Sequence, residues 1–200
     1  MAFVVVYDAC VLYPSHLRDL LVRLANAGIV QAKWSERIVD EAISAILRDR
    51  PFLDDKLKRT RDLLLDAAPD CLVSGHEGLI DALELPDPDD RHVLAVAIRA
   101  HAQVIVTLNV RDFPPSALEP YAIEAQSPDE FVLNLLDLWR PKVDAVIDQM
   151  LGALTKPPLD RGELLDILAR DGLPHTTARL GQQAIGPSRS SVPAHEEPST

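Results

Sequence analysis

The segment Phe3-Val4-Val5-Val6-Tyr7-Asp8 decides the fold class of this chain. Its first five residues form a short apolar run rich in β-branched side chains, which predicts a strand buried on both faces. An acid follows at once, so we expect a first strand here and not a signal peptide. The carboxyl ends of parallel strands line the ligand crevice of α/β sheets, and Asp8 would therefore point into a site. The alternative, that Asp8 caps a turn, stays open.

Strand and helix patterns alternate downstream of this segment. Further strands are expected at residues 29–33, 71–74, 103–108 and 121–125. Helices are expected at residues 17–27, 35–47, 54–66 and 93–100, and again from Ser127, where a capping box with Pro at the first turn opens a helix. This alternation predicts an α/β fold with a parallel sheet of about five strands and helices on both faces.

The character of the chain changes toward its C-terminus. Pro141 restarts a helix with one apolar stripe, and Asp160 with Glu163 forms a second capping pattern before another helix. The last residues are dominated by Pro, Ser and Glu, which is typical of disorder. We therefore divide the chain into an α/β domain at residues 1–135, a small helical extension at residues 136–183 and a disordered tail at residues 184–200.

Composition limits the classes of function. The net charge of -11 argues against a protein that holds nucleic acid by general charge attraction, but less against a metallonuclease, whose divalent ions neutralise an acidic pocket. Cys10 and Cys71 are isolated on apparent strands and indicate buried thiols, with no zinc spacing and no disulfide framework. No apolar run approaches the ~20 residues of a membrane helix, so we expect a cytoplasmic protein without a membrane partner.

Two further acids, Glu41 and Asp90, lie at positions where a charged side chain needs an interaction partner. Glu41 falls at the edge of the apolar stripe of its helix, where a half-buried carboxylate needs a partner. That partner is either a metal ion or a salt bridge to Arg37 or Arg48. Asp90 lies in the first turn of an apolar helix, where it would either cap the helix or serve as an ionised metal ligand.

A polar segment follows the fourth expected strand. It carries Thr107, Asn109 and Asp112. Polar groups at strand and helix ends that converge from distant parts of a sequence describe a hard-cation site made of oxygen ligands. The candidate site therefore combines this segment with the acids already named.

Five motifs occur along the chain in one order. They are Asp-Ala-Cys-Val-Leu-Tyr-Pro at residues 8–14, Leu-Arg-Asp-Leu-Leu at residues 17–21, Trp34-Ser35 followed by Glu41, Leu-Pro-Asp-Pro-Asp-Asp-Arg-His-Val-Leu-Ala at residues 85–95, and the segment at residues 107–114. In these motifs the chain resembles the PIN-domain family, most closely its bacterial branch of VapC-type toxins. The resemblance covers about residues 3–135 and implies a PIN-like α/β/α sandwich.

The resemblance also implies an activity, that of a metal-dependent endoribonuclease acting as the toxin of a toxin–antitoxin module. It assigns catalytic and metal-binding roles, with Mg²⁺ or Mn²⁺ as cofactor, to Asp8, Glu41 and Asp90. Many members carry a fourth acid where this chain has Asn109, but a common variant has Asn there and an Asp three residues later, which matches Asp112. Thr107 would be a polar neighbour of the site. Bound divalent ions activate water and stabilise charge on the scissile phosphate.

The basic stretch at residues 48–61 is a candidate surface for guiding RNA to the site. Six basic residues stand there against three acids, a local surplus of +3: Arg48, Arg50, Lys56, Lys58, Arg59 and Arg61. A solvated helix face is the alternative. Contact with an antitoxin is a third interpretation, because toxin relatives meet their antitoxin in this general region. The resemblance further implies a homodimer.

Other classes of protein fit the sequence less well. A haloacid-dehalogenase-type phosphatase needs a second acid where Cys10 stands, and a receiver domain needs an acid and a lysine near Ser74 and Gln126. Gly-rich nucleotide-binding loops are missing. A catalytically inactive PIN fold that serves as a binding or scaffold protein stays open, since Asn109 and the acidic charge favour it. For the helical extension, dimer stabilisation, antitoxin contact and RNA gripping all stay open.

Overall fold

The chain folds around a four-stranded sheet in which all strands are parallel. The computed structural model describes residues 3–66, 70–155 and 158–182, and the predicted disordered tail lies outside these ranges. The strands are β1 (Phe3–Tyr7), β2 (Val30–Lys33), β3 (Val104–Val106) and β4 (Glu124–Gln126), in the spatial order β2-β1-β3-β4. The predicted α/β class and parallel sheet are confirmed.

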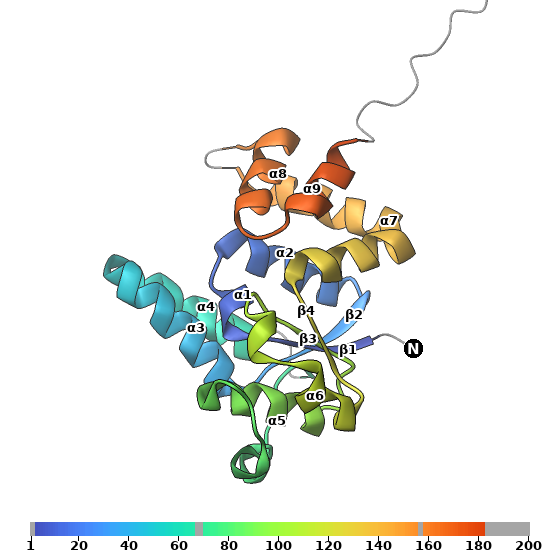
Figure 1. The fold of residues 1–200 in the computed structure, drawn as a ribbon. Helices are drawn as coiled ribbons and strands as arrows, with labels where there is room; N and C mark the ends of the chain where they lie inside the picture. The colour runs from blue at the N-terminus through green and yellow to red at the C-terminus, as the bar shows by residue number, and fades with distance from the viewer. Residues whose placement is uncertain (1–2, 67–69, 156–157, 183–200) are drawn as a thin grey trace, which may run out of the picture.

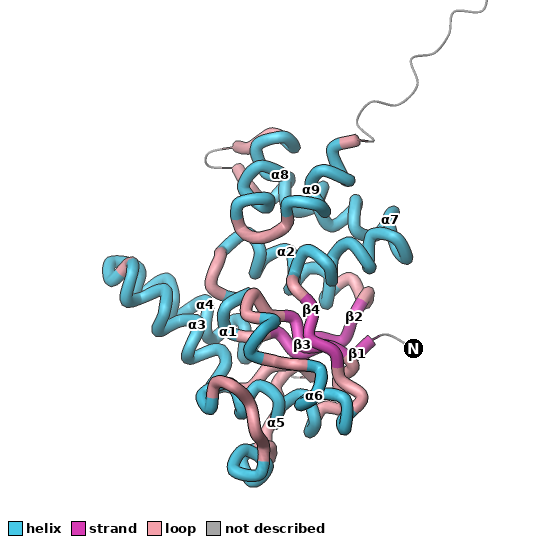
Figure 2. The backbone as a smooth tube through the Cα atoms, in the orientation of Figure 1, coloured by secondary structure: helices cyan, strands magenta, loops and turns pink. Residues whose placement is uncertain are grey.

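Helices make up most of the remaining structure (Figure 2). They are α1 (Ala9–Leu12), α2 (Ser15–Asn26), α3 (Glu36–Asp49), α4 (Asp54–Asp66), α5 (Arg91–Arg99), α6 (Pro115–Leu118), α7 (Pro128–Ala153), α8 (Arg161–Arg170) and α9 (Pro174–Gly181). Helices α2 and α7 pack together on one side of the sheet and α5 packs against β1 and β3 on the other, which gives the predicted α/β/α layers (Figure 1). In the described ranges, we find no helix with the length and apolar character needed to cross a membrane.

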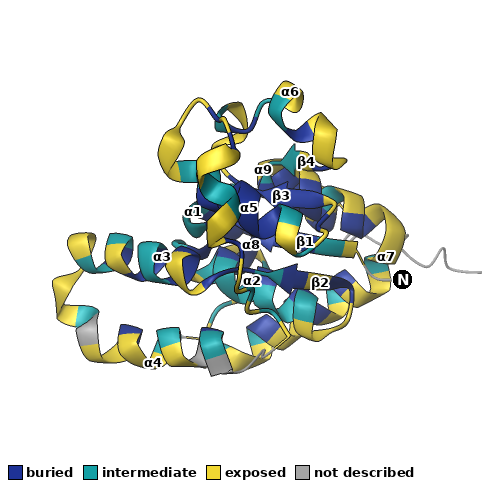
Figure 3. Ribbon diagram, turned by 90° about the horizontal axis from the view of Figure 1, so that it is seen from below, coloured by how far each residue is buried: buried dark blue, intermediate teal, exposed yellow. Residues whose placement is uncertain are grey.

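The first strand is the centre of the core. Val5, Val6 and Tyr7 have no exposed surface, whereas Phe3 at the start of β1 is half exposed. The Tyr7 ring stacks on Trp34 with centroids 6.2 Å apart, and its hydroxyl donates to the Leu21 carbonyl at 3.2 Å. Burial is greatest along β1, β3 and α5 (Figure 3). The apolar run that opens the sequence thus forms the buried strand it predicts.

The third expected strand, at residues 71–74, is wrong as a strand. Only Leu72 pairs there, in an isolated parallel bridge with Trp34 just beyond the end of β2. Gly75 follows with a φ of +74° and turns the chain away, so the pairing does not extend. The sheet therefore has four strands and one bridge. Cys71 lies in a turn and Cys10 in α1, so neither cysteine is on a strand.

The last strand and the following helix show two further local effects. Strand β4 begins at Glu124, later than expected, because Glu119–Tyr121 forms a 3-10 turn and Ala122 takes a φ of +55°. Helix α7 has a non-helical Trp139 at φ −138° and ψ 34°, just before Pro141. Proline lacks the backbone N–H that a helix interior uses, and α7 accordingly consists of two helical stretches that meet at a kink at Trp139, so the predicted restart at Pro141 is confirmed.

The C-terminal helices form a further layer above α2 and α7 (Figure 1). Helix α8 begins with the predicted capping box, in which Glu163 N donates to Asp160 Oδ1 at 2.8 Å and Asp160 N donates to Glu163 Oε2 at 2.9 Å. Helix α9 is attached to α7 through Asp129, which is 7% exposed. Each motif that predicted a helix start in this region is confirmed.

Asp129 is the polar anchor of that layer. It accepts hydrogen bonds from His175 N at 3.0 Å and from Thr176 N at 2.8 Å, while Thr176 Oγ1 donates to the Asp129 carbonyl at 3.1 Å. Burial alone would raise the pKa of Asp129, but the hydrogen bonds from Thr176 and His175 outweigh burial and hold that pKa below its usual value. The ionised form of this carboxylate therefore stabilises the fold.

Asp129→Ala is expected to lower the free energy of unfolding by about 2–4 kcal/mol at pH 7, since it leaves buried N–H groups without an acceptor. Denaturant titration checks this. Because the pKa is depressed in the fold, the contribution is complete above about pH 4 and is lost as the pH falls through the lower folded value. Asp137→Ala, which breaks the exposed pair with Arg179, is the control and should cost under about 1 kcal/mol. Equal losses of unfolding free energy in the two variants would show that Asp129 does not anchor the C-terminal layer.

Candidate active site

Asp8 lies at the carboxyl end of β1 and is 5% exposed. Its Oδ1 accepts from Ala9 N at 2.6 Å, which makes it the N-cap of α1. Its Oδ2 accepts from Thr107 Oγ1 at 2.8 Å and from Cys10 Sγ at 3.1 Å. Both readings of the sequence therefore apply, because one oxygen caps a turn while the other faces the end of the neighbouring strand β3.

The end of β3 supplies the polar partners of Asp8. Thr107 is fully buried, and Asn109 N donates to its Oγ1 at 3.0 Å. Cys10 was not among the candidates, yet its Sγ also accepts from Leu108 N at 3.2 Å. Burial, followed by the charge of Asp8, raises the pKa of the Cys10 thiol to about 12, so it stays a protonated donor. Its position two residues after Asp8 was the signal available in the sequence.

Asp90 ends the 3-10 turn Pro88–Asp90 and precedes α5. It stands in the N-cap position but makes no side-chain capping hydrogen bond. Asp87 does the local capping instead, since its Oδ1 accepts from Asp89 N at 2.9 Å. Helix capping therefore does not account for Asp90, whose carboxylate is left to the site.

Electrostatics link Asp90 to the other acids. Burial raises its pKa to about 6, and repulsion from Asp8, Asp87 and Asp112 adds to the shift, while His92 opposes it. Asp112 itself ends the turn Val110–Asp112, with its side chain 22% exposed. The charges of Asp8 and Asp112 thus act on Asp90, and we call these three predicted acids, Asp8, Asp90 and Asp112, the carboxylate cluster.

Glu41 lies beside this cluster but is already paired. Its Oε1 accepts from Arg37 Nε at 2.9 Å, and its Oε2 lies 3.0 Å from His92 Nε2. Burial would raise the pKa of Glu41, but the hydrogen bonds from His92 and Arg37 outweigh burial and lower it. The salt-bridge alternative to Arg37 is therefore present. His92, 1% exposed, was missed as a partner because nothing local in the sequence joins it to Glu41.

The carboxylate cluster fits a hard divalent cation by its chemistry. Carboxylate and hydroxyl oxygens are the ligands that Mg²⁺ and Mn²⁺ prefer, and a cation would relieve the repulsion that raises the pKa of Asp90. The ligand set is not closed, since no three His, Cys, Asp or Glu side chains in the described ranges are grouped closely enough to hold a metal ion. Asp8, Asp90 and Asp112 are the residues that would hold one, with Thr107 as a neighbour.

Comparison with known proteins identifies the fold. The family model described as "PIN domain" matches residues 4–111, more than half of the chain. The chain belongs to the PIN-domain family. Residues 128–182, which include α7, α8 and α9, match the model described as "VapC50 C-terminal domain". The resemblance to VapC-type proteins predicted from the motifs is thereby confirmed.

One curated relative shares much of the sequence. It is described as "Putative ribonuclease VapC50" of Mycobacterium tuberculosis and is 51% identical over 79 residues. The matching stretch is 40% of this chain and 47% of the relative, so the match spans about half of that protein. No solved structure was found to match.

Helices α3 and α4 of the PIN domain lie side by side and project from its body (Figure 3). They carry the basic stretch. Arg61 on α4 is held by Asp40 and Glu36 of α3, each at 2.6 Å, so its charge is neutralised there. The other five basic residues of the stretch are exposed: Arg48, Arg50, Lys56, Lys58 and Arg59. Of these, Lys58 lies 4.0 Å from Asp55. We call α3 and α4 together the α3–α4 hairpin. Its positive charge is therefore smaller than the surplus of +3 counted in the sequence suggests.

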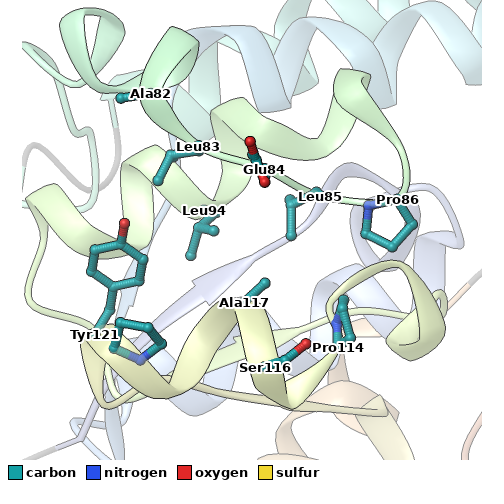
Figure 4. A pocket seen from close by; sticks show the side chains of 11 residues that line it. Ala82, Leu83, Glu84, Leu85, Pro86, Leu94, Pro114, Ser116, Ala117 and Tyr121 are labelled. Atoms are coloured by element: carbon teal, nitrogen blue, oxygen red, sulfur yellow. The ribbon is translucent and has the colours of Figure 1, made fainter.

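A cavity of about 550 Å³ lies beside the PIN-domain site but does not include the carboxylate cluster (Figure 4). Leu85 and Leu94 point toward Ala117 across it, and Glu84 is the charged residue on its wall. Pro86 and Pro114, which line it, stand next to the segments that carry Asp90 and Asp112. The cavity is thus a neighbour of the site, and the described residues that line it offer no set of metal ligands.

Asp90→Asn is expected to stabilise the PIN domain by about 1 kcal/mol at pH 8 in EDTA, because it removes an ionised carboxylate from a repulsive cluster. Because the pKa of Asp90 is raised in the fold, the native state keeps a proton that the unfolded state has already lost. The ionised Asp90 therefore begins to lower the free energy of unfolding between about pH 4 and 6, and this loss persists at higher pH. Denaturant titrations at pH 8 and pH 4 measure the difference, which should shrink at pH 4. Asp89→Asn in the same turn is the control; an equal gain there would contradict the assignment of repulsion to Asp90.

Proposed function

We propose that this chain is a metal-dependent endoribonuclease and the toxin of a toxin–antitoxin module, with Mg²⁺ or Mn²⁺ as cofactor and RNA as substrate. The observation that carries the proposal is the carboxylate cluster, in which Asp8 follows β1, Asp90 precedes α5 and Asp112 lies in the segment after β3. A relative described as a ribonuclease, 51% identical over its matched part, supports the same activity.

A bound divalent cation would supply an activated water and stabilise negative charge on the scissile phosphate. The chain's own residues prepare for this. Thr107 and Cys10 fix one oxygen of Asp8, and Ala9 N fixes the other, so the side chain is oriented before any ligand arrives. Asp90, whose pKa is about 6, is largely ionised at neutral pH. Asp112 completes the cluster from the segment after β3.

Glu41 is proposed as the fourth acid, oriented from behind by His92. A buried histidine that holds a carboxylate by one nitrogen fixes its direction, as outer groups commonly do around metal sites. Asn109 and Thr107 are proposed as supporting groups rather than ligands. In this proposal, Asp112 and not Asn109 is the metal-binding residue of the segment after β3.

For the substrate we propose single-stranded RNA, because splayed bases are easier for a protein to read than an A-form helix. The exposed basic residues of the α3–α4 hairpin are proposed to guide it: Arg48, Arg50, Lys56, Lys58 and Arg59. Arg61 contributes less because of its two acidic partners. A cognate antitoxin and a second copy of the chain are proposed as partners, and a cytoplasmic location follows from such a substrate. The domain division at residues 1–135 and 136–183 is retained as part of the proposal.

A catalytically inactive PIN fold that binds without cutting is the second candidate. Two observations favour it. Glu41 is already paired with Arg37 and His92, and in the described ranges no three potential ligands are grouped for a metal ion. The acid cluster would then be a remnant of the fold, and its repulsion would have no function.

The first test is cleavage of total bacterial RNA by the purified protein in Mg²⁺, Mn²⁺ or EDTA. Discrete fragments are expected only with metal, and Asp8→Asn and Asp90→Asn should each lower the cleavage rate by about a hundredfold or more. Asp89→Asn, an exposed acid of the same turn, should cleave like the wild type. Folded protein that neither cuts RNA nor binds Mn²⁺ by calorimetry would favour the inactive candidate. Cleavage that survives both substitutions would place the site elsewhere.

The role of Glu41 has its own test. Glu41→Gln keeps the size of the side chain but removes its charge, and it should lower both Mn²⁺ affinity and the cleavage rate by about tenfold or more. Arg37→Ala breaks the exposed ion pair while leaving the carboxylate, so its cost should be limited to stability, at or below about 1 kcal/mol. Should the two variants behave alike, Glu41 is a partner of Arg37 and no more.

A further inference from the structure

A second cavity, of about 510 Å³, lies where the C-terminal helices meet the PIN domain. Its walls come from three places in the chain. Tyr13 after α1, His16 at the start of α2 and Arg50 after α3 form one wall, Leu108 after β3 forms a second, and the end of α8 with the turn that follows supplies Arg170, Asp171 and Gly172. We call this space the joint cavity, because it is incomplete without the C-terminal helices.

The joint cavity adjoins the carboxylate cluster through one residue. Leu108 lines it and directly follows Thr107, which donates to Asp8. The backbone of Leu108 also donates to Cys10 Sγ, the other side-chain partner of Asp8. Gly172, on the C-terminal wall of the cavity, also lies close to Leu108, since a Cβ added to Gly172 would be 3.2 Å from Leu108 Cδ2. The C-terminal turn therefore packs directly on the segment that carries the site.

Charge distinguishes this cavity from the rest of an acidic chain. Arg50 stands at the end of α3 and Arg170 in the last turn of α8, so two arginines from different layers line one space. In the part of the chain that the structure describes, neither forms a salt bridge, although the Nε of Arg170 donates to the Asp166 carbonyl at 3.1 Å. The acid on the wall, Asp171, lies 3.9 Å from His16.

We propose that the joint cavity is an RNA subsite in which Arg50 and Arg170 bind backbone phosphates next to the scissile bond. The proposal rests on the proposed nuclease function. Arginines without an acidic partner match phosphate oxygens by paired hydrogen bonds. The volume lies in the range of pockets that enclose a ligand the size of a nucleotide. Leu108, which lines the cavity, directly follows Thr107, so the cavity adjoins the strand end that holds Asp8.

This assignment gives the C-terminal extension a role in gripping RNA. The extension supplies Arg170, which faces the PIN-domain wall that holds Arg50. The PIN domain alone contributes Arg50 to this cavity, whereas the two layers together contribute two arginines. An acidic segment of a protein partner is the other anion that could bind two arginines, and the experiment separates it from RNA.

The test uses the full-length chain with Asp90→Asn, so that RNA stays intact, and a fluorescein-labelled 12-nucleotide single-stranded RNA followed by anisotropy. Arg170→Ala and Arg50→Ala should each raise Kd by about tenfold. Each should also reduce the slope of log Kd against log salt by about 0.7, the value for one lost phosphate contact on a single strand. Arg179→Ala removes the same charge from the extension but lies in a pair with Asp137, and it should change Kd less than about twofold. Thermal melting confirms that each variant is folded.

Separate outcomes decide the subsite and the nuclease. If the wild type cleaves RNA while Arg170→Ala and Arg179→Ala bind it equally well, the subsite is wrong and the nuclease stands. If the wild type cleaves nothing but the two cavity arginines still determine RNA affinity, the subsite stands and the proposed activity fails. If the arginine variants lose affinity for a poly-glutamate peptide and not for RNA, the cavity belongs to a protein partner and the RNA assignment is overturned.

Discussion

The position of Asp8 between two strand ends is the constraint on which the site depends. Strands β1 and β3 are parallel neighbours, and their register pairs Tyr7 with Val106. Asp8 and Thr107 are the next residues of the two strands, and their side chains bond at 2.8 Å. Asp8 N also donates to the Val106 carbonyl at 3.1 Å, so both backbone and side chain hold the acid at the sheet edge. A shift of one residue in this pairing would turn Asp8 into the core and remove the site.

The carboxylates that gather around Asp8 destabilise the fold, and the surrounding hydrogen bonds reduce this cost. Asp8 has three donors, from Ala9, Cys10 and Thr107, whereas Asp90 has repulsive neighbours and no capping bond. The raised pKa of Asp90 is the sign that the fold leaves this repulsion in place. Within the described residues Asp8 and Asp90 form no salt bridge, whereas Asp112 lies 3.8 Å from Arg111 and Glu41 is paired with Arg37.

Local signals in the sequence predicted local structure well. The apolar run at residues 3–7, the capping residue Ser35 and the box from Asp160 to Glu163 each form what they predict, because neighbouring residues decide these features. Long-range partners were not visible. Residues 71–74 fail as a strand because only Trp34 is available to pair, and the contact of Glu41 with His92 depends on how α3 meets the start of α5. Strand and helix ends and the family resemblance predicted Asp8, Asp90 and Asp112 as site residues, whereas they gave no role to the thiol of Cys10, which the structure shows bonded to Asp8.

The role of the C-terminal helices illustrates the same limit and also suggests why they exist. Their turn meets Leu108 at Gly172, a contact that no pattern along the sequence marks. An acidic site that acts on an acidic substrate needs cations close by, yet an arginine within reach of Asp8 or Asp90 would pair with the carboxylate and neutralise it. Arg170 is carried on a separate layer, with Leu108 between the joint cavity and Thr107. In the proposed subsite, that separation would keep the carboxylates available for a metal ion and the arginine available for phosphate.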